Sequence, residues 1–367
     1  MAKNSNYRYQ KKNLNKKMTN INPVLGIIGG GQLGSMLATA AKKIKIKTII
    51  LSDDPKAPAK NFSDETIITN YNNLKKIDEF VNKVDFVTFE FENIPFNVLE
   101  HISKRKPVYP KPSINQIVQN RFTEKNFVNK QGIKTTNYIL IKNKSDLLND
   151  ETLLPGFLKT CTLGYDGKGQ YILNNRDEID ELKIDFRKEY ILEKKINLKK
   201  EISIIITRFL NNDCLIYEPV ENLHVNQILN KSIIPAAIDK NIFTQAQQQA
   251  KLLAEKLDYV GTMCVEYFID EHNNLLLNEI APRVHNSGHL TINAYNVSQF
   301  ENHIRAVCNL TTVVLKKICN AEMINIIGEE IKSYRAKPFS KNEFFFDYLK
   351  KKIKQKRKMG HLTIIKS

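Results

Sequence analysis

A short segment, NEIAPRVHNSGH (residues 278–289), gathers many groups that can do chemistry. Its twelve positions hold a carboxylate, an arginine, two histidines and two asparagine amides. A strand in the protein core would not carry so many groups that are costly to bury without partners. The segment is therefore predicted to line a polar, charged pocket, and other motifs have to indicate which ligand it binds.

The residues just before and within this segment predict a metal site. Residues 260–283 read as two strands joined by the turn DEHNN, a hairpin in which Glu266 and Glu279 can face one another. These two carboxylates and Asn278 offer the oxygen ligands that suit Mg²⁺ bound together with phosphate oxygens. Like charges on adjacent strands repel, which favours a cation between them, and a purely structural pair of acids is the alternative.

A glycine-rich hairpin is predicted at GFLKTCTLGYDGKGQYIL (residues 156–173). A strand ends at Lys159, a loop with three glycines follows, and a strand resumes at Tyr171. A Walker-type phosphate loop opens a helix instead. The pattern therefore favours a flexible lid over nucleotide phosphates, to which Lys159 offers a point charge, and an ordinary surface hairpin is the alternative.

Glycines also mark the first predicted strand and helix. Residues 24–55 read as a strand, the turn GGGQLG, a helix and a second strand, a βαβ unit of the Rossmann-like type. Asp53 and Asp54 follow the turn by about twenty residues, where a dinucleotide fold places its ribose-binding acid. A dinucleotide site is one interpretation, and a tight turn that binds no ligand is the other.

The next strands are predicted at residues 65–69 and 84–94, and the second places Glu90 and Glu92 on one face. Two prolines in YPKPS end the first domain near residue 112. Beyond it, apolar spacing predicts one helix over residues 114–131, with Arg121 and Lys125 on its polar side and Gly132 after its end. Residues 189–209 then read as two strands separated by a short break.

Length and composition predict a soluble, cytoplasmic protein of two or three domains. The 367 residues are 42% hydrophobic, and no apolar run is long enough for a membrane span or a signal peptide. The cysteines lack CxxC spacing and are expected to be reduced thiols: Cys161, Cys214, Cys264, Cys308 and Cys319.

The formal net charge of +17 raises nucleic acid as a partner. Much of the excess lies in residues 1–17 and 350–358, and no aromatic stacking platforms alternate with arginines. The distribution therefore argues against nucleic-acid binding as the main function. Residues 1–22 are predicted to form a disordered basic tail.

Several motifs together resemble the ATP-grasp carboxylate-amine ligase superfamily: Lys159, the GYDGKGQ hairpin, LEKKI followed by Glu201, and Glu266 paired with NEIAPR. Within it, seven motifs are similar in kind and order to those of the N5-carboxyaminoimidazole ribonucleotide synthetases of purine biosynthesis. These motifs are GGGQLG, VTFEFENI, YPKPS, GYDGKGQ, NLHVNQIL, NEIAPRVHNSGH and RKMGH, between about residues 24 and 364.

The resemblance implies an α/β and α+β multidomain fold. A Rossmann-like pre-ATP-grasp domain would span residues 23–112. An ATP-grasp domain would span residues 113–320, with its lid at about 140–200. A small C-terminal subdomain would span residues 321–367, and the chain would form a homodimer.

The resemblance also implies the reaction, with ATP and Mg²⁺ as cofactors. Bicarbonate attacks the γ-phosphate to give carboxyphosphate, and the amine of 5-aminoimidazole ribonucleotide captures its carboxyl or the carbon dioxide released from it. Lys159 and Arg283 would be catalytic, and Glu266 and Glu279 would bind the metal. Contacts to ATP are implied for Arg121, Lys159, Gly164, Tyr165, Asp166, Gly167, Lys168, Gly169, Gln170, Glu193, Lys194, Lys195, Ile196, Glu201, His224, Asn278 and Glu279.

On the same grounds, the first glycine turn would serve the amine substrate and not a dinucleotide. Fixed donors such as Arg283 are needed because negative charge develops during both phosphoryl transfer and carboxyphosphate breakdown. Contacts to the imidazole ribonucleotide are implied for Gln32, Leu33, Glu92, His285, Asn286, Ser287, Lys351, Arg357 and Lys358, the last three neutralising its phosphate.

Two departures from the family pattern stand out. Lys354 takes the place of a second arginine, and lysine cannot form the bidentate fork. The sequence stops at GHLTIIKS, where relatives continue for about one more helix, so the C-terminal subdomain is expected to be truncated, frayed or completed by a partner subunit.

Alternatives stay open. The first is a sister ATP-grasp enzyme, such as the formate-dependent glycinamide ribonucleotide transformylase or a biotin carboxylase. The second is a nicotinamide oxidoreductase. The third is a basic nucleic-acid-binding protein, an interpretation that would explain only the basic tails.

Overall fold

The structure, a computed structural model, describes residues 22–149, 151–164 and 169–366. Nearly all of the predicted basic tail therefore lies outside the described residues. The same is true of four predicted ATP contacts, Tyr165, Asp166, Gly167 and Lys168. None of the helices in the described ranges combines the length and apolar character that a membrane span requires.

A four-stranded parallel sheet forms the N-terminal part, in the order β3-β2-β1-β4. Its strands are β1 (Val24–Ile28), β2 (Lys47–Ser52), β3 (Glu65–Ile68) and β4 (Phe86–Phe89), with α2 (Gln32–Lys43), η1 (Pro58–Asn61), α3 (Leu74–Lys83) and α4 (Phe96–Ser103) between and after them. Leu25 and Ile27 pack towards α2, whereas Ile28 packs with residues of α3 and α4 on the other face. The predicted Rossmann-like βαβ unit is confirmed.

The predicted strand over residues 84–94 is too long, because β4 ends at Phe89. The chain then turns towards the N-terminus of α2, where the buried Glu90 carboxylate accepts hydrogen bonds from the backbone N–H groups of Gly31 and Gly34. Glu90 and Glu92 therefore do not share one face of a strand. The free N–H groups at this helix start, which could have bound a phosphate, are satisfied by a side chain of the protein.

A large antiparallel sheet forms the centre of the molecule, in the order β14-β13-β9-β11-β12-β15-β17-β16, with β10 paired to β9. Its strands are β9 (Leu198–Arg208), β10 (Cys214–Ile216), β11 (Val220–Val225), β12 (Ile228–Ile234), β13 (Gly261–Asp270), β14 (Leu275–Ala281), β15 (Asn320–Ile327), β16 (Glu343–Asp347) and β17 (Lys358–Lys366). Because β12 pairs with β15, the expected C-terminal subdomain continues the central sheet.

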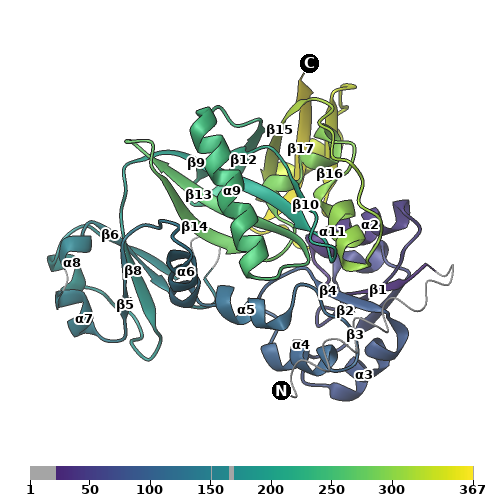
Figure 1. Ribbon diagram of the computed structural model, residues 1–367, viewed down its shortest axis with the longest axis horizontal. Helices are drawn as coiled ribbons and strands as arrows, with labels where there is room; N and C mark the ends of the chain where they lie inside the picture. Colours follow the sequence, from purple (N-terminus) through teal and green to yellow (C-terminus); the bar gives the residue numbers. More distant parts are fainter. Residues whose placement is uncertain (1–21, 150, 165–168, 367) are drawn as a thin grey trace.

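Helices cover both faces of the central sheet (Figure 1). The long helix α9 (Lys240–Lys256) packs on one face. On the other side, α11 (Gln299–Val307) packs against α2 and so joins the central sheet to the N-terminal part. The shorter helices of this part are η3 (Asn286–Gly288), α10 (Thr291–Ala294), η4 (Gly328–Glu330) and α12 (Ile331–Ala336).

A second antiparallel sheet, the lid sheet, has the order β5-β8-β6-β7 and stands at one end of the molecule (Figure 1). Its elements are β5 (Tyr138–Ile141), α7 (Lys144–Asn149), η2 (Glu151–Leu153), β6 (Gly156–Thr160), β7 (Gln170–Leu173), α8 (Asp177–Asp180) and β8 (Tyr190–Lys194). In the pairing of β6 with β7, Lys159 lies opposite Gln170, so the predicted hairpin is confirmed.

The single helix predicted over residues 114–131 is instead two helices, α5 (Pro112–Val118) and α6 (Arg121–Lys130). The side chain of Asn120 between them accepts hydrogen bonds from the N–H groups of Phe122 (2.9 Å) and Thr123 (3.2 Å). Asparagine is among the best N-cap residues and competes with helix continuation. As a result, Arg121 opens α6.

Candidate active site

One cavity of about 990 Å³ lies between the central sheet, the lid sheet and the N-terminal part. It brings together most of the site residues predicted from the sequence. They are Gln32, Leu33, Glu92, Arg121, Lys159, Gly164, Gln170, Glu193, Lys194, Lys195, Ile196, Glu201, His224, Glu266, Asn278, Glu279, Arg283, His285, Asn286, Arg357 and Lys358.

Three described candidates do not line this cavity, namely Gly169, Ser287 and Lys351. Asp53 and Asp54, which the dinucleotide interpretation required, are exposed and also lie outside it.

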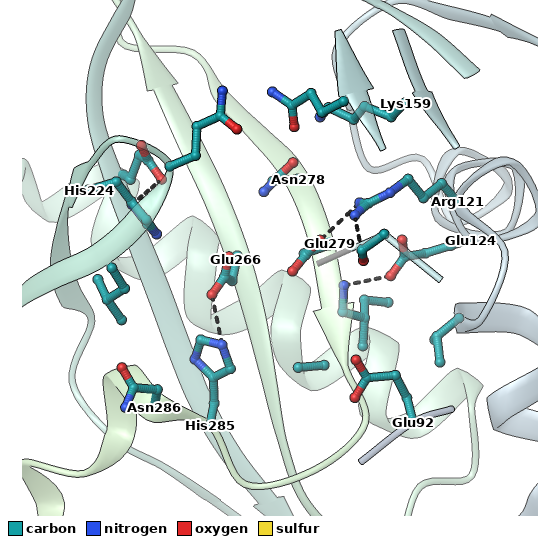
Figure 2. Close-up of a pocket in the computed structure, with 18 of the residues that line it drawn as sticks. Glu92, Arg121, Glu124, Lys159, His224, Glu266, Asn278, Glu279, His285 and Asn286 are labelled. Atoms are coloured by element: carbon teal, nitrogen blue, oxygen red, sulfur yellow. Dashed lines mark hydrogen bonds and ion pairs between the residues drawn. The ribbon is translucent and has the colours of Figure 1, made fainter. Parts of the chain in front are cut away.

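The two predicted metal acids lie opposite one another in the pairing of β13 with β14 (Figure 2). Side chains alternate along β13, so Val265 and Tyr267 face α9 whereas Glu266 faces the cavity. Burial, and next the charge of Glu279, raise the pKa of Glu266 to about 8. The nearby Glu279 charge destabilises the charged form of Glu266, and a bound cation would relieve that repulsion.

Glu279 is anchored by α6. The Arg121 guanidinium donates to Glu279 Oε2 at 3.0 Å (Figure 2). One turn further along α6, the buried Glu124 carboxylate accepts the backbone N–H of Ile280 at 2.6 Å. Burial, followed by the charge of Glu279, raises the pKa of Glu124 to about 8. Glu124 was not among the site residues predicted from the sequence, although its i, i+3 spacing from Arg121 indicated that the two share a helix face.

We expect Glu124 to position Glu279. In Glu124→Ala the Ile280 N–H would be buried without an acceptor, which costs roughly 1–3 kcal/mol and loosens the strand that carries Glu279. Glu124→Gln keeps an acceptor oxygen at the same place. Thermal unfolding and ATP turnover should therefore be impaired in the alanine variant and close to wild type in the glutamine variant. Equal losses in both variants would show that the charge of Glu124 is what matters.

Lysines gather around Glu193 at the lid side of the cavity. Glu193 Oε2 lies 3.1 Å from the Lys159 ammonium and 3.5 Å from that of Lys125, which is 1% exposed. Burial alone would raise the pKa of Glu193, but Lys125 and Lys159 lower it to about 2. The carboxylate therefore stays charged and holds Lys159 beside the cavity. Lys125, like Glu124, lies on the inward face of α6.

A histidine and an acid from neighbouring strands face the cavity further along the sheet. His224 Nδ1 lies 2.9 Å from Glu201 Oε2. Burial favours the neutral imidazole, but the hydrogen bond to Glu201 and the negative charge of Glu201 outweigh burial and raise the pKa of His224. Because the sheet pairs Asn222 with Glu201, the two strands bring these side chains together.

Arg283 follows β14 and pairs with Glu92 of the N-terminal part. Its Nε donates to Glu92 Oε2 at 2.5 Å and its Nη2 to Glu92 Oε1 at 3.3 Å, a two-point ion pair. His285, two residues after Arg283, contacts the other acid: its Nε2 lies 3.1 Å from Glu266 Oε1. The second ring nitrogen, Nδ1, lies 2.9 Å from the hydroxyl oxygen of the buried Ser287. Burial and the charge of Arg283 lower the pKa of His285, so its imidazole is neutral.

The basic C-terminal loop reaches the cavity through Lys350, and not through the predicted Lys351, which is exposed. Lys350 Nζ donates to Gln32 Oε1 at 2.5 Å and to the backbone oxygen of Lys358 at 2.6 Å. Leu349, the residue before Lys350, has a φ of 52°, and this backbone conformation decides which of the adjacent lysines faces the cavity. A non-glycine residue in this conformation is uncommon, and the sequence carries no clear signal for it.

Comparisons with known proteins match three successive regions of the chain. Residues 22–119 match the ribonucleotide synthetase pre-ATP-grasp domain, residues 126–300 the ATP-grasp domain, and residues 321–367 the phosphoribosylaminoimidazole carboxylase C-terminal domain. The cavity, the lid hairpin and the paired acids thus belong to an ATP-grasp ligase.

Full-length relatives specify the family. The N5-carboxyaminoimidazole ribonucleotide synthase of Bacillus subtilis strain 168 is 37% identical over 347 residues, 94% of this chain and 91% of its own. An N5-carboxyaminoimidazole ribonucleotide synthetase solved as its ADP complex is 39% identical, with a TM-score of 0.90 over 94% of this chain and 93% of the other. The chain belongs to the N5-carboxyaminoimidazole ribonucleotide synthase family.

A family structure from Aspergillus clavatus, in complex with ADP and 5-aminoimidazole ribonucleotide, is 28% identical. Its TM-score is 0.86 over 94% of each chain.

Proposed function

We propose that this enzyme carboxylates 5-aminoimidazole ribonucleotide with bicarbonate and ATP, giving N5-carboxyaminoimidazole ribonucleotide, ADP and phosphate in purine biosynthesis. The observation that carries the proposal is that one cavity joins a paired-acid site, a cationic lid side and a cationic C-terminal loop. The family relationship supports it, since one relative was crystallised with both ADP and the aminoimidazole ribonucleotide.

Mg²⁺ is proposed at Glu266 and Glu279. Both residues and Asn278 offer oxygen atoms, the ligands this hard cation prefers. Burial and then the charge of Glu279 raise the pKa of Glu266, and a divalent cation would relieve the repulsion from Glu279. When bound, Mg²⁺ would neutralise charge on the nucleotide phosphates.

The ATP phosphates are proposed to lie beside Arg121 and Lys159, which the acids Glu279 and Glu193 hold in place. Fixed cations of this kind stabilise the transferring phosphoryl group without having to reorganise during the reaction. The segment Glu193–Ile196 at the end of β8 would hold adenine, and Glu201 would accept hydrogen bonds from the ribose hydroxyls.

At the other end of the cavity, Gln32, Lys350, Arg357 and Lys358 would bind the ribonucleotide, with the phosphate against the three cations. Its amine would then lie towards His285 and Arg283. Arg283 would stabilise the negative charge of bicarbonate and of carboxyphosphate, and the surrounding cavity walls would exclude water from this labile intermediate.

The neighbouring lysines provide a matched test of the phosphate site. Lys350→Ala should raise the KM for the aminoimidazole ribonucleotide roughly tenfold or more, because a charge-assisted phosphate contact is lost. Lys351→Ala removes the same charge from an exposed position and should change this KM by less than about twofold. Steady-state kinetics at saturating ATP measure both, and a reversed order would reassign the phosphate site to Lys351.

The decisive assay is bicarbonate-dependent ADP release. Stimulation by 5-aminoimidazole ribonucleotide supports the proposed function. Stimulation only by glycinamide ribonucleotide plus formate would assign the chain to the sister ATP-grasp activity.

The homodimer and the cytoplasmic location are further proposals that rest on the family resemblance. Light scattering tests the homodimer, which should have a mass near twice the 42.4 kDa of one chain. Cell fractionation tests the location.

A further inference from the structure

A thiol lies within reach of the acidic site. Cys264 and Glu266 are two residues apart on β13 and so share a face of the strand, and His285 follows β14. The Cys264 Sγ, a Glu266 carboxylate oxygen and a ring nitrogen of His285 all lie within 4.8 Å of one another. Sulfur, nitrogen and oxygen ligands converge here, and the proposed Mg²⁺ site uses only the oxygen.

This set of ligands suits zinc better than magnesium. Zn²⁺ binds thiolate sulfur at about 2.3 Å and imidazole nitrogen or carboxylate oxygen at about 2.0–2.2 Å, so tetrahedral ligands lie roughly 3.5 Å apart. The observed spacing would have to contract by up to about 1.3 Å, which small side-chain rotations can supply. Mg²⁺ takes oxygen ligands and gains nothing from the thiol.

The ion could enter from the cavity. Glu266 and His285 both line it, whereas Cys264 is fully buried behind them, 3.9 Å from the Ser287 hydroxyl. Figure 2 shows Glu266 and His285 pointing towards each other.

We propose that Cys264, Glu266 and His285 form a site for Zn²⁺ that shares Glu266 with the proposed Mg²⁺ site, so that zinc inhibits the enzyme by competing with magnesium. The inhibitory part rests on the proposed function of Glu266, whereas the binding part rests on geometry alone.

Cobalt(II) is the spectroscopic probe for the binding part. The experiment uses the full chain carrying Cys214→Ala and Cys319→Ala, which removes the two partly exposed cysteines. One bound cobalt per chain with a thiolate-to-cobalt charge-transfer band is expected, and Cys264→Ala and Cys264→Ser should each abolish the band. Absence of the band before Cys264 is replaced, or its persistence in both Cys264 variants, would overturn the proposal.

Zinc inhibition at fixed Mg²⁺ and ATP tests the sharing of Glu266. Each protein is compared with its own rate without zinc. Loss of a metal ligand should weaken zinc inhibition at least about tenfold in Cys264→Ala, and Cys214→Ala should remain as sensitive as wild type. A cobalt band without zinc inhibition would refute the sharing of Glu266. The band does not depend on turnover, so failure of the proposed carboxylation would leave the binding result unaffected.

Discussion

Replacing Glu279 by glutamine should reduce ATP turnover by roughly a hundredfold or more, because the change removes one charge from the proposed metal site at nearly constant volume. Glu279 lies opposite Glu266 and holds Arg121 at 3.0 Å, so the substitution affects both the cation ligands and the phosphate contact. ADP release at saturating substrates measures the effect. The repulsion on Glu266 should also fall, which lowers its pKa.

Glu271→Gln is the matched control for this variant. Glu271 lies in the turn of the same hairpin, but it is exposed and outside the cavity. Circular dichroism and thermal unfolding should show an intact fold in both variants. A Glu279→Gln enzyme that turns over at the wild-type rate would refute the metal assignment.

Arg283→Lys is expected to have the second large effect. Arg283 is held by two hydrogen bonds to Glu92, with Nε at 2.5 Å and Nη2 at 3.3 Å, which fixes the guanidinium at the cavity wall. Lysine keeps the charge but cannot bind two oxygens of Glu92 and still direct a planar donor at an anion. We expect kcat to fall roughly a hundredfold, the loss typical of one preorganised donor, with a smaller change in the KM for ATP.

Arg305→Lys provides the comparison for this second variant. Arg305 also pairs with an acid, Glu301, but on α11 and outside the cavity. Its substitution should leave kcat close to wild type. If Arg283→Lys raised only the KM for bicarbonate and left kcat unchanged, Arg283 would bind the ground state and not the developing charge.

The sequence predicted best those features that depend on local pattern. The hairpin and its short turn predicted that Glu266 would lie near Glu279, although a register shift between Glu266 and Tyr267 is what places the two acids directly opposite one another. The lid hairpin followed from glycines placed between two strands. In each of these cases, residues close in sequence determine the contact.

Features that depend on distant contacts or single backbone angles were not predictable from the sequence. Glu90 turns away from β4 because the α2 N-terminus, far along the chain, offers it N–H donors. The break at Asn120 depends on its side chain, which accepts the N–H group of Phe122 and so caps α6, whereas the sequence pattern was equally compatible with one continuous helix. The selection of Lys350 over Lys351 depends on one left-handed residue, Leu349.

The pairing of β12 with β15 places the two ends of the cavity on one hydrogen-bonded ladder. Glu279 on β14 and Lys358 at the start of β17 are therefore held at a set spacing, since neither strand can shift without breaking the intervening pairs. The lid sheet β5-β8-β6-β7 is not hydrogen-bonded into this sheet. The distance between the proposed metal site and the proposed sugar-phosphate site is therefore fixed by the backbone of the central sheet.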